Sequence, residues 1–361
     1  MKRKINKMYR LHAIFSKKCS KICIYAIFIV NLQADCVISG ITTLKNVDST
    51  LDKRRLYLRI LNIILPVAAY GFLLYKLVTY DNYAAMAEHF KTADVEQYFC
   101  LLLAFCLFPL NVGLDGFRWR YMLRHVEPMT LWDANRQVYY GFLGAFLTPY
   151  RMGDYPTRAM LFHNPGNWHM ALAYGGVTAF ATTMVIVLSG LPSAFVFFSN
   201  SDNRTPFWIA LGAALGLTLI LSTLPVILRK LKNIHYWRSD RLREVTEALA
   251  AMRMVEFLFI LLQTLCRYLC FMTQFYLILR FTGVALSATE AMVILPTYYL
   301  LITLTPYVPA AEIGIRGSWA MVVFGYYSHE MAASAALAAV LVWVINTIPP
   351  MIIGSMVRKH D

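Results

Sequence analysis

The sequence predicts an all-α fold, that of a polytopic helical membrane protein, and three observations support this fold class. Hydrophobic residues make up 58% of the 361 residues and charged residues only 15%, whereas soluble domains carry about 25% charged residues. Several apolar stretches reach the roughly 20 residues that a transmembrane helix needs. Lys and Arg concentrate in the segments between these stretches. The sequence therefore excludes an ordinary soluble domain.

Six apolar stretches are long enough to cross a bilayer by themselves. They comprise residues 60–79, 98–116, 170–198, 206–228, 256–281 and 334–354. Two further segments are too short or too interrupted, namely 137–148 and the stretch 291–327 with its break at 306–317. We interpret these two as re-entrant hairpins, which enter the membrane and return to the same side. Eight simple spans are the alternative.

The distribution of charge predicts the orientation. Basic clusters precede the first span and follow the second and the fourth, whereas residues 80–97 hold four acidic residues against one Lys. The positive-inside rule places the basic segments in the cytoplasm. Both termini are then cytoplasmic in a multi-pass protein of the cell (inner, cytoplasmic) membrane. Because this bias accounts for the net charge of +14, no nucleic-acid partner is expected.

These assignments agree only if the two hairpins enter from opposite sides. The order of span, hairpin and span then occurs twice with opposite polarity, over residues 98–198 and 256–354. Such an order is typical of an inverted repeat with broken helices near the bilayer midplane. We expect residues 56–361 to form a single transmembrane domain. Residues 1–55 are expected to be a disordered or interfacial basic tail.

The first candidate site is a short segment that combines proline, glycine, arginine and aspartate. Its members are Pro149, Arg151, Gly153, Asp154 and Arg158. Proline ends the preceding helix, and glycine permits a tight turn. Two guanidinium groups at the mouth of a hairpin suit a phosphate, which Arg binds in bidentate fashion. The alternative is an Arg–Asp pair that only satisfies the turn.

The second candidate site repeats this combination in the other hairpin. Its members are Pro306, Glu312, Gly314 and Arg316, with Pro306 and Gly314 as the turn residues. Charged side chains within an apolar stretch are costly and usually face a cavity or a partner. Opposed hairpins are expected to bring the two charged groups toward one another.

Three further arginines complete the candidate residues. Arg267 lies near the middle of the 256–281 span, where it is too deep to reach the interface easily. Its expected partner is a buried acid such as Asp154 or Glu312. Arg267 then either forms a structural ion pair or contacts the substrate. Arg118 and Arg120 follow a span and are expected at the membrane interface.

Several chemistries have no motif in the sequence. There is no Walker loop, no GxSxG turn and no HExxH pair. The seven cysteines do not show the spacing of metal ligands. No catalytic residue, metal or cofactor is therefore assigned, and the chain is expected to be a transporter rather than an enzyme.

Three segments together resemble a known family. They are DGFRWRYML at 115–123, PYRMGDYPTR at 149–158 and TPYVPAAEIGIRG at 305–317. They resemble landmarks of the flippase-like transmembrane family typified by the membrane region of lysylphosphatidylglycerol synthase, over most of residues 60–354. Asp154 stands where that family usually has Glu, and Gly317 replaces a final Glu. No soluble aminoacyl-transferase domain is expected here, so the resemblance implies lipid translocation, not lysine transfer.

The leading hypothesis is a transporter that moves a phospholipid or a lipid-linked anionic amphiphile between leaflets. Arg151, Arg158 and Arg316 are expected to meet its phosphate. One alternative is a membrane-embedded enzyme that modifies a lipid or lipid-linked sugar through Asp154 or Glu312. Another is a non-catalytic membrane scaffold. The expected partner is a membrane lipid, with room for a separate lipid-modifying enzyme, and the oligomeric state is not predicted.

Overall fold

The computed structural model describes residues 94–148, 151–198, 240–305 and 311–357, together with Gly71, Leu74, Tyr75 and Val78. All of these residues belong to the unit Asn62–Asp361, and within them every regular element is a helix. Four predictions lie wholly or largely outside the described residues: the tail 1–55, the spans 60–79 and 206–228, and the turn prolines Pro149 and Pro306.

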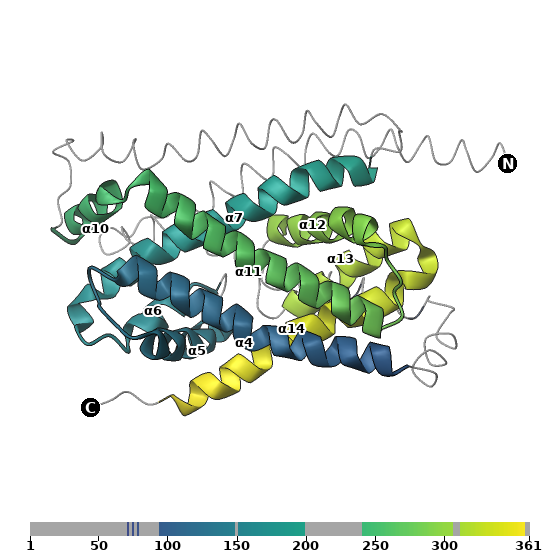
Figure 1. Cartoon of the computed structure of the whole chain (residues 1–361), viewed down its shortest axis with the longest axis horizontal. Helices are drawn as coiled ribbons and strands as arrows, with labels where there is room; N and C mark the ends of the chain where they lie inside the picture. Colours follow the sequence, from purple (N-terminus) through teal and green to yellow (C-terminus); the bar gives the residue numbers. More distant parts are fainter. Residues whose placement is uncertain are drawn as a thin grey trace, which may run out of the picture. The chain divides into compact units, whose positions relative to one another are not determined.

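The helices follow one another in two similar runs (Figure 1). The first run is α4 (Val95–Leu123), α5 (Leu131–Leu147), α6 (Asp154–Ala159), the 3-10 turn η2 (Pro165–Asn167) and α7 (Trp168–Phe198). The second run is α10 (Asp240–Ala251), α11 (Met254–Phe281), α12 (Ala288–Leu304), α13 (Glu312–Tyr327), the 3-10 turn η4 (His329–Met331) and α14 (Ala332–Met356).

Four of the described helices are long and apolar enough to cross a membrane. They are α4, α7, α11 and α14, with 29, 31, 28 and 25 residues. At about 1.5 Å per residue, even 25 residues span more than the roughly 30 Å of a hydrocarbon core. The predicted class of helical membrane protein is confirmed. However, α4 continues to Leu123, beyond the predicted end at 116.

Each predicted interruption separates two shorter helices. The helix before each break starts with a side-chain cap, since Thr130 Oγ1 accepts a hydrogen bond from the Asp133 amide and Ser287 Oγ from the Glu290 amide. The second break requires a correction. Helix α13 already begins at Glu312, so Gly314 is buried within its first turn and is not a turn residue. An acid at the N-terminus favours this early start.

Helices α4 and α11 pack against each other in antiparallel orientation. At one end, Arg124 Nη2 lies 2.5 Å from Glu256 Oε1. At the other end, Arg280 Nη2 lies 3.2 Å from Glu96 Oε1. The two ion pairs join the start of each helix to the end of the other.

Helix α7 packs on α12, and α14 packs on α5. Glycines make both approaches close. A Cβ at Gly190 would collide with Leu300 and with the carbonyl oxygen of Pro296, and a Cβ at Gly354 would collide with the carbonyl oxygen of Tyr139. Helices α7 and α14 thus each contact the broken segment of the other run.

Two hydrophobic clusters form the interior. One surrounds Trp119 and Phe162 and draws on α4, α5, α7 and the first half of α11. The other surrounds Phe275 and Phe324 and draws on the second half of α11 with α12, α13 and α14. In Figure 1, α5 and α6 lie at one end of this arrangement and α12 and α13 at the other.

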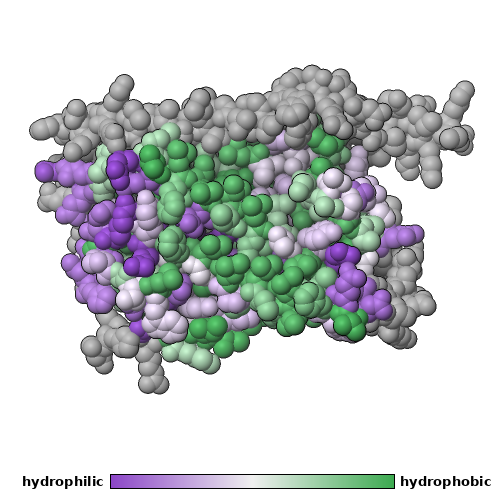
Figure 2. Space-filling view, viewed as in Figure 1, coloured by the Kyte–Doolittle hydropathy of each residue, from purple (hydrophilic) through white to green (hydrophobic). Residues whose placement is uncertain are grey.

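The outer faces of α4 and α11 are apolar and exposed. Leu102 and Leu110 on α4 are more than half exposed, as are Leu262 and Leu269 on α11. Figure 2 shows apolar residues over the middle of this face and hydrophilic residues toward its two ends. This distribution suits helices whose outer faces contact lipid.

Candidate functional site

A buried carboxylate, Asp115, lies among three arginines. Its Oδ1 accepts a hydrogen bond from Arg118 Nη2 at 2.6 Å and lies 3.1 Å from Arg267 Nη1. Its Oδ2 accepts from Arg158 Nη2 at 3.0 Å. The side chains of Asp115, Arg118 and Arg158 are each 3% exposed. One acid on α4 therefore ties together α4, α6 and α11.

A second carboxylate supports Arg158. Arg158 Nε donates to Asp154 Oδ1 at 2.6 Å, and Arg158 Nη2 donates to Asp154 Oδ2 at 3.0 Å. The guanidinium carbon also lies 5.2 Å from the ring centroid of Trp119 and 5.1 Å from that of Tyr155. Arg158 is thus fixed by two acids and two aromatic rings.

We call the five charged residues Asp115, Arg118, Asp154, Arg158 and Arg267 the Asp115 cluster. Two carboxylates face three guanidinium groups, so the cluster carries a net charge of +1. An unbalanced charge away from water is expensive. The cluster is therefore a natural site for an anion. Arg267 is its most accessible member, with 21% of its side chain exposed.

Neutral side chains orient two of the arginines. Arg118 Nη1 donates to Thr264 Oγ1 at 2.9 Å, and Arg267 Nε donates to Asn111 Oδ1 at 2.8 Å. Asn111 is 2% exposed. Because its oxygen accepts from Arg267, its Nδ2 group is the remaining donor, and this group is buried without a hydrogen-bond partner among the described residues.

The turn that positions α6 is built differently from the prediction. Arg151, and not Gly153, takes the left-handed conformation, with a φ of 56°. Gly153 has an ordinary φ of −74°, and its amide donates to Thr148 Oγ1 at 2.7 Å. The lack of a side chain matters because a Cβ at Gly153 would collide with the carbonyl oxygen of Gly144. Gly153 therefore allows the turn to pack closely against the backbone of α5.

The structure separates the predicted residues of the first site. Asp154 and Arg158 belong to the Asp115 cluster. Arg151 is only partly buried, and its guanidinium carbon lies 5.4 Å from the ring centroid of Phe142. Arg151 is therefore placed against an aromatic ring, and the ion pairs that define the Asp115 cluster do not include it.

Two predictions about arginines need correction. Arg267 pairs with Asp115, not with Asp154 or Glu312, because α4 rather than a hairpin lies against it. Arg118 is buried and not interfacial, since α4 continues past the predicted end of the span and turns this side chain toward Asp115 and Thr264. Arg120, two residues later, is exposed.

The second predicted site forms a separate ion pair. Arg316 Nη2 and Nε donate to Glu312 Oε1 at 2.9 and 3.1 Å. The Tyr298 hydroxyl donates to the Arg316 carbonyl at 3.3 Å. Like Asp154 and Arg158, this acid and arginine are four residues apart at the start of a helix that follows a break.

Aromatic side chains occupy the region between Arg267 and Arg316. The Arg267 guanidinium carbon lies 5.5 Å from the Phe271 ring centroid. The Tyr299 hydroxyl donates to the Phe271 carbonyl at 3.4 Å. Tyr299 stacks edge-on against Tyr298, with centroids 5.5 Å apart, and Tyr298 reaches Arg316. The two charged groups, which the sequence predicts to lie toward one another, are separate and are linked through these aromatic residues.

Sequence reasoning missed Asp115 and Asn111. Asp115 stands near the end of the predicted span 98–116, where a charged residue is unremarkable. Its spacing of three residues from Arg118 was the available signal, since residues three apart share one helix face. Asn111, one turn earlier than Asp115, offered no signal apart from its polarity within an apolar stretch.

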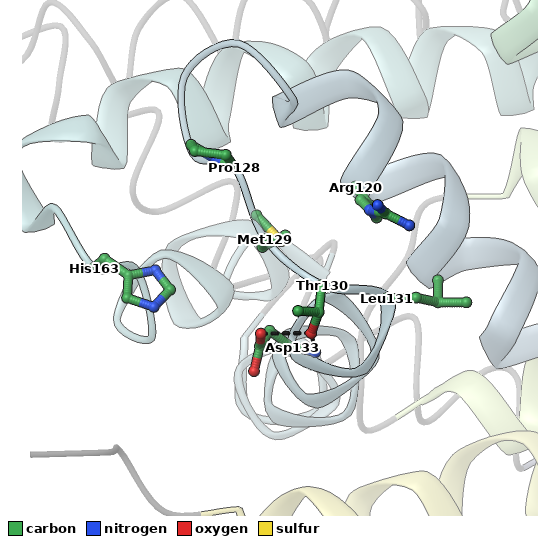
Figure 3. A pocket seen from close by; sticks show the side chains of 7 residues that line it. All are labelled: Arg120, Pro128, Met129, Thr130, Leu131, Asp133 and His163. Atoms are coloured by element: carbon green, nitrogen blue, oxygen red, sulfur yellow. Dashed lines mark hydrogen bonds between the residues drawn. The ribbon is translucent and has the colours of Figure 1, made fainter.

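An open pocket lies beside the Asp115 cluster's helix α4, at the start of α5 (Figure 3). It is lined by Arg120, Pro128, Met129, Thr130, Leu131, Asp133 and His163. The Thr130 hydroxyl donates to Asp133 at 2.6 Å, and this hydrogen bond holds the pKa of the Asp133 carboxyl below its usual value. His163 Nδ1 lies 2.9 Å from the buried Glu127. The pocket therefore mixes both signs of charge.

Comparison with known proteins identifies one family. The family model described as the lysylphosphatidylglycerol synthase TM region matches residues 63–354. No curated protein and no solved structure matches the chain.

Proposed function

Because this chain belongs to the lysylphosphatidylglycerol synthase transmembrane-region family, we propose that it translocates a phospholipid or a lipid-linked anionic amphiphile between leaflets. The family makes it a membrane protein related to lipid handling. The observation that supports translocation most directly is the Asp115 cluster, a group of five charged residues with a net charge of +1 held among candidate membrane spans. Charges at such a position usually mark a substrate path.

The proposed path follows the polar and aromatic side chains between the two hairpins. The headgroup enters at the Asp115 cluster, where Arg267 is accessible, and passes Phe271 and Tyr299 toward the pair of Glu312 and Arg316. Tyr and Phe rings suit this role because a ring contacts acyl chains and a hydroxyl contacts a headgroup. The acyl chains remain against the apolar faces of the helices.

We further infer that the two runs of helices form an inverted repeat with two re-entrant hairpins. Matching features support this inference. Each broken segment begins with a capped helix, at Thr130 and at Ser287, and each break is followed by an acid–arginine pair. The cross-contacts of α7 with α12 and of α14 with α5 also correspond. Opposed half-helices that meet near the midplane are the usual setting of a transporter site.

The orientation belongs to the proposal as well. The basic segments that follow α4 and precede α11 include Arg124, Arg136 and Arg243. The positive-inside rule places them in the cytoplasm, with both chain termini on the same side. Headgroups from the cytoplasmic leaflet then reach the α5–α6 hairpin first.

Lipid analysis of a deletion strain tests transport against enzymatic modification. We expect the total lipid inventory, measured by mass spectrometry, to be unchanged, because a transporter makes and breaks no covalent bond. The leaflet distribution of at least one anionic lipid, measured with a membrane-impermeant labelling reagent, should change. A missing lipid species would instead support the membrane-embedded enzyme and contradict the proposal. Restoring the gene on a plasmid serves as the control.

A further inference from the structure

Within the Asp115 cluster, the arginines differ in accessibility, because Arg267 is 21% exposed and the other two are almost fully buried. Arg158 is engaged by two carboxylates, and Arg118 by Asp115 and Thr264. Both side chains are 3% exposed. At this exposure, neither guanidinium group is open to a ligand that approaches from outside the cluster. The prediction that Arg158 meets the phosphate is therefore not favoured by its contacts.

Arg267 and Asn111 both have hydrogen-bond donors that are not used within the cluster. Arg267 uses Nε on Asn111 and Nη1 on Asp115, and no described residue accepts from its Nη2. Asn111 uses its oxygen on Arg267, which leaves its buried Nδ2 group without a partner in the described part of the chain. A buried donor without a hydrogen-bond partner is energetically unfavourable. The unpartnered Nδ2 group therefore belongs to a side chain that is hydrogen-bonded to the accessible Arg267.

We infer that Arg267 and Asn111 form an anion-binding subsite for a headgroup with a single negative charge, a phosphodiester whose remaining part is uncharged. The inference rests on the proposed function, because it names the ligand class of the same site. One negative charge balances the net charge of +1, whereas a phosphomonoester dianion exceeds it. Both carboxylates of the cluster are already paired with arginines, so an amine on the headgroup would have to compete with those ion pairs.

Asn111 also gives the subsite its geometry. The hydrogen bond from Arg267 Nε at 2.8 Å directs Oδ1 of Asn111 toward the guanidinium group, so the Nδ2 donor of the same amide lies close to the arginine. Two such donors match two oxygens of one phosphate. Because Asn111 lies on α4 and Arg267 on α11, the bound anion joins the two central helices.

Binding in neutral detergent tests the subsite apart from transport. The purified full chain is titrated with dihexanoyl-phosphatidylglycerol, dihexanoyl-phosphatidate, dihexanoyl-phosphatidylcholine and inorganic phosphate by isothermal calorimetry. We expect the phosphatidylglycerol to bind at least about tenfold more tightly than the other two lipids. Inorganic phosphate distinguishes a lipid site from a site for the free anion, since equal affinity for inorganic phosphate and the phosphodiester lipid would overturn the headgroup assignment.

Variants locate the binding. Asn111→Leu removes the neutral donor, and Arg267→Gln removes the charged one. Each should weaken phosphatidylglycerol binding by about tenfold or more, the usual effect of losing a hydrogen bond to a charged group. Arg280→Gln is the matched control on the same helix, since Arg280 is exposed and pairs with Glu96, and its affinity should stay within about twofold. Unchanged affinity in both site variants would overturn the subsite.

Two further measurements decide the outcome if a variant fails, namely the headgroup selectivity of the wild-type chain and leaflet transfer. If a site variant does not fold, which gel filtration and circular dichroism reveal, the headgroup selectivity of the wild-type chain still decides, because indifference to headgroup charge contradicts the inference. Leaflet transfer is measured separately on the same preparations. Selective binding without transfer would leave the subsite standing and refute the transport proposal, whereas transfer without headgroup selectivity would refute the subsite alone.

Discussion

Replacing Asp115 with Asn is expected to destabilise the protein by about 3–5 kcal/mol, the usual cost of removing one partner from a buried ion pair. The change leaves three buried or half-buried guanidinium groups with one carboxylate, so the net charge of the Asp115 cluster rises from +1 to +2. Asp115 is also the contact that joins α4 to α6 and α11. Unfolding in mixed micelles, followed by circular dichroism, measures the effect.

A surface acid provides the control for Asp115. Glu247 pairs with Arg243 one turn away, and their side chains are 42% and 71% exposed, so Glu247→Gln should cost no more than about 0.5 kcal/mol. The double variant Asp115→Asn/Arg267→Gln restores a net charge of +1 and should recover part of the lost stability. A double variant as unstable as the sum of the two single variants would show that charge balance does not stabilise the cluster.

Replacing Gly144 with Ala is expected to have the second largest effect. Its Cβ would meet the Thr157 hydroxyl and the backbone carbonyl of Gly153. The backbone cannot move aside without displacing α6, which carries Asp154 and Arg158. Overpacking of this kind costs about 1–3 kcal/mol, and the displacement should also weaken binding at the Asp115 cluster.

Gly113 is the matched control for Gly144, because nothing lies within 4 Å of a Cβ built there. Gly113→Ala should be neutral or stabilise α4 by up to about 1 kcal/mol, since Ala is the better helix former. Both variants are compared by the same unfolding assay. Equal effects at Gly113 and Gly144 would mean that the close approach of α5 and α6 is not what Gly144 provides.

The fold class could be predicted because it depends on local properties of the chain. Long apolar stretches and interrupted ones are visible in the sequence, and four of them correspond to α4, α7, α11 and α14. Helix ends were less predictable. Helix α4 runs past 116 and α13 starts at Glu312, because buried ion pairs stabilise charged residues within a helix that hydropathy alone would end.

The candidate site was only partly predictable. The pairs of Asp154 with Arg158 and of Glu312 with Arg316 follow from a spacing of four residues on a helix. The pairing of Arg267 with Asp115 and Asn111 spans more than 150 positions, and it depends on how α4 and α11 pack. No spacing within one segment reveals such a contact.

Leaflet transfer in liposomes tests the central claim most directly. The wild-type chain, Arg267→Gln and the control Arg280→Gln are reconstituted at equal density in vesicles that contain a fluorescent phosphatidylglycerol, and dithionite quenching reports the lipid accessible from outside. We expect rapid loss of more than the outer-leaflet signal with wild type and Arg280→Gln, and loss near the protein-free level with Arg267→Gln. Equal transfer by all three proteins would contradict a headgroup path through the Asp115 cluster.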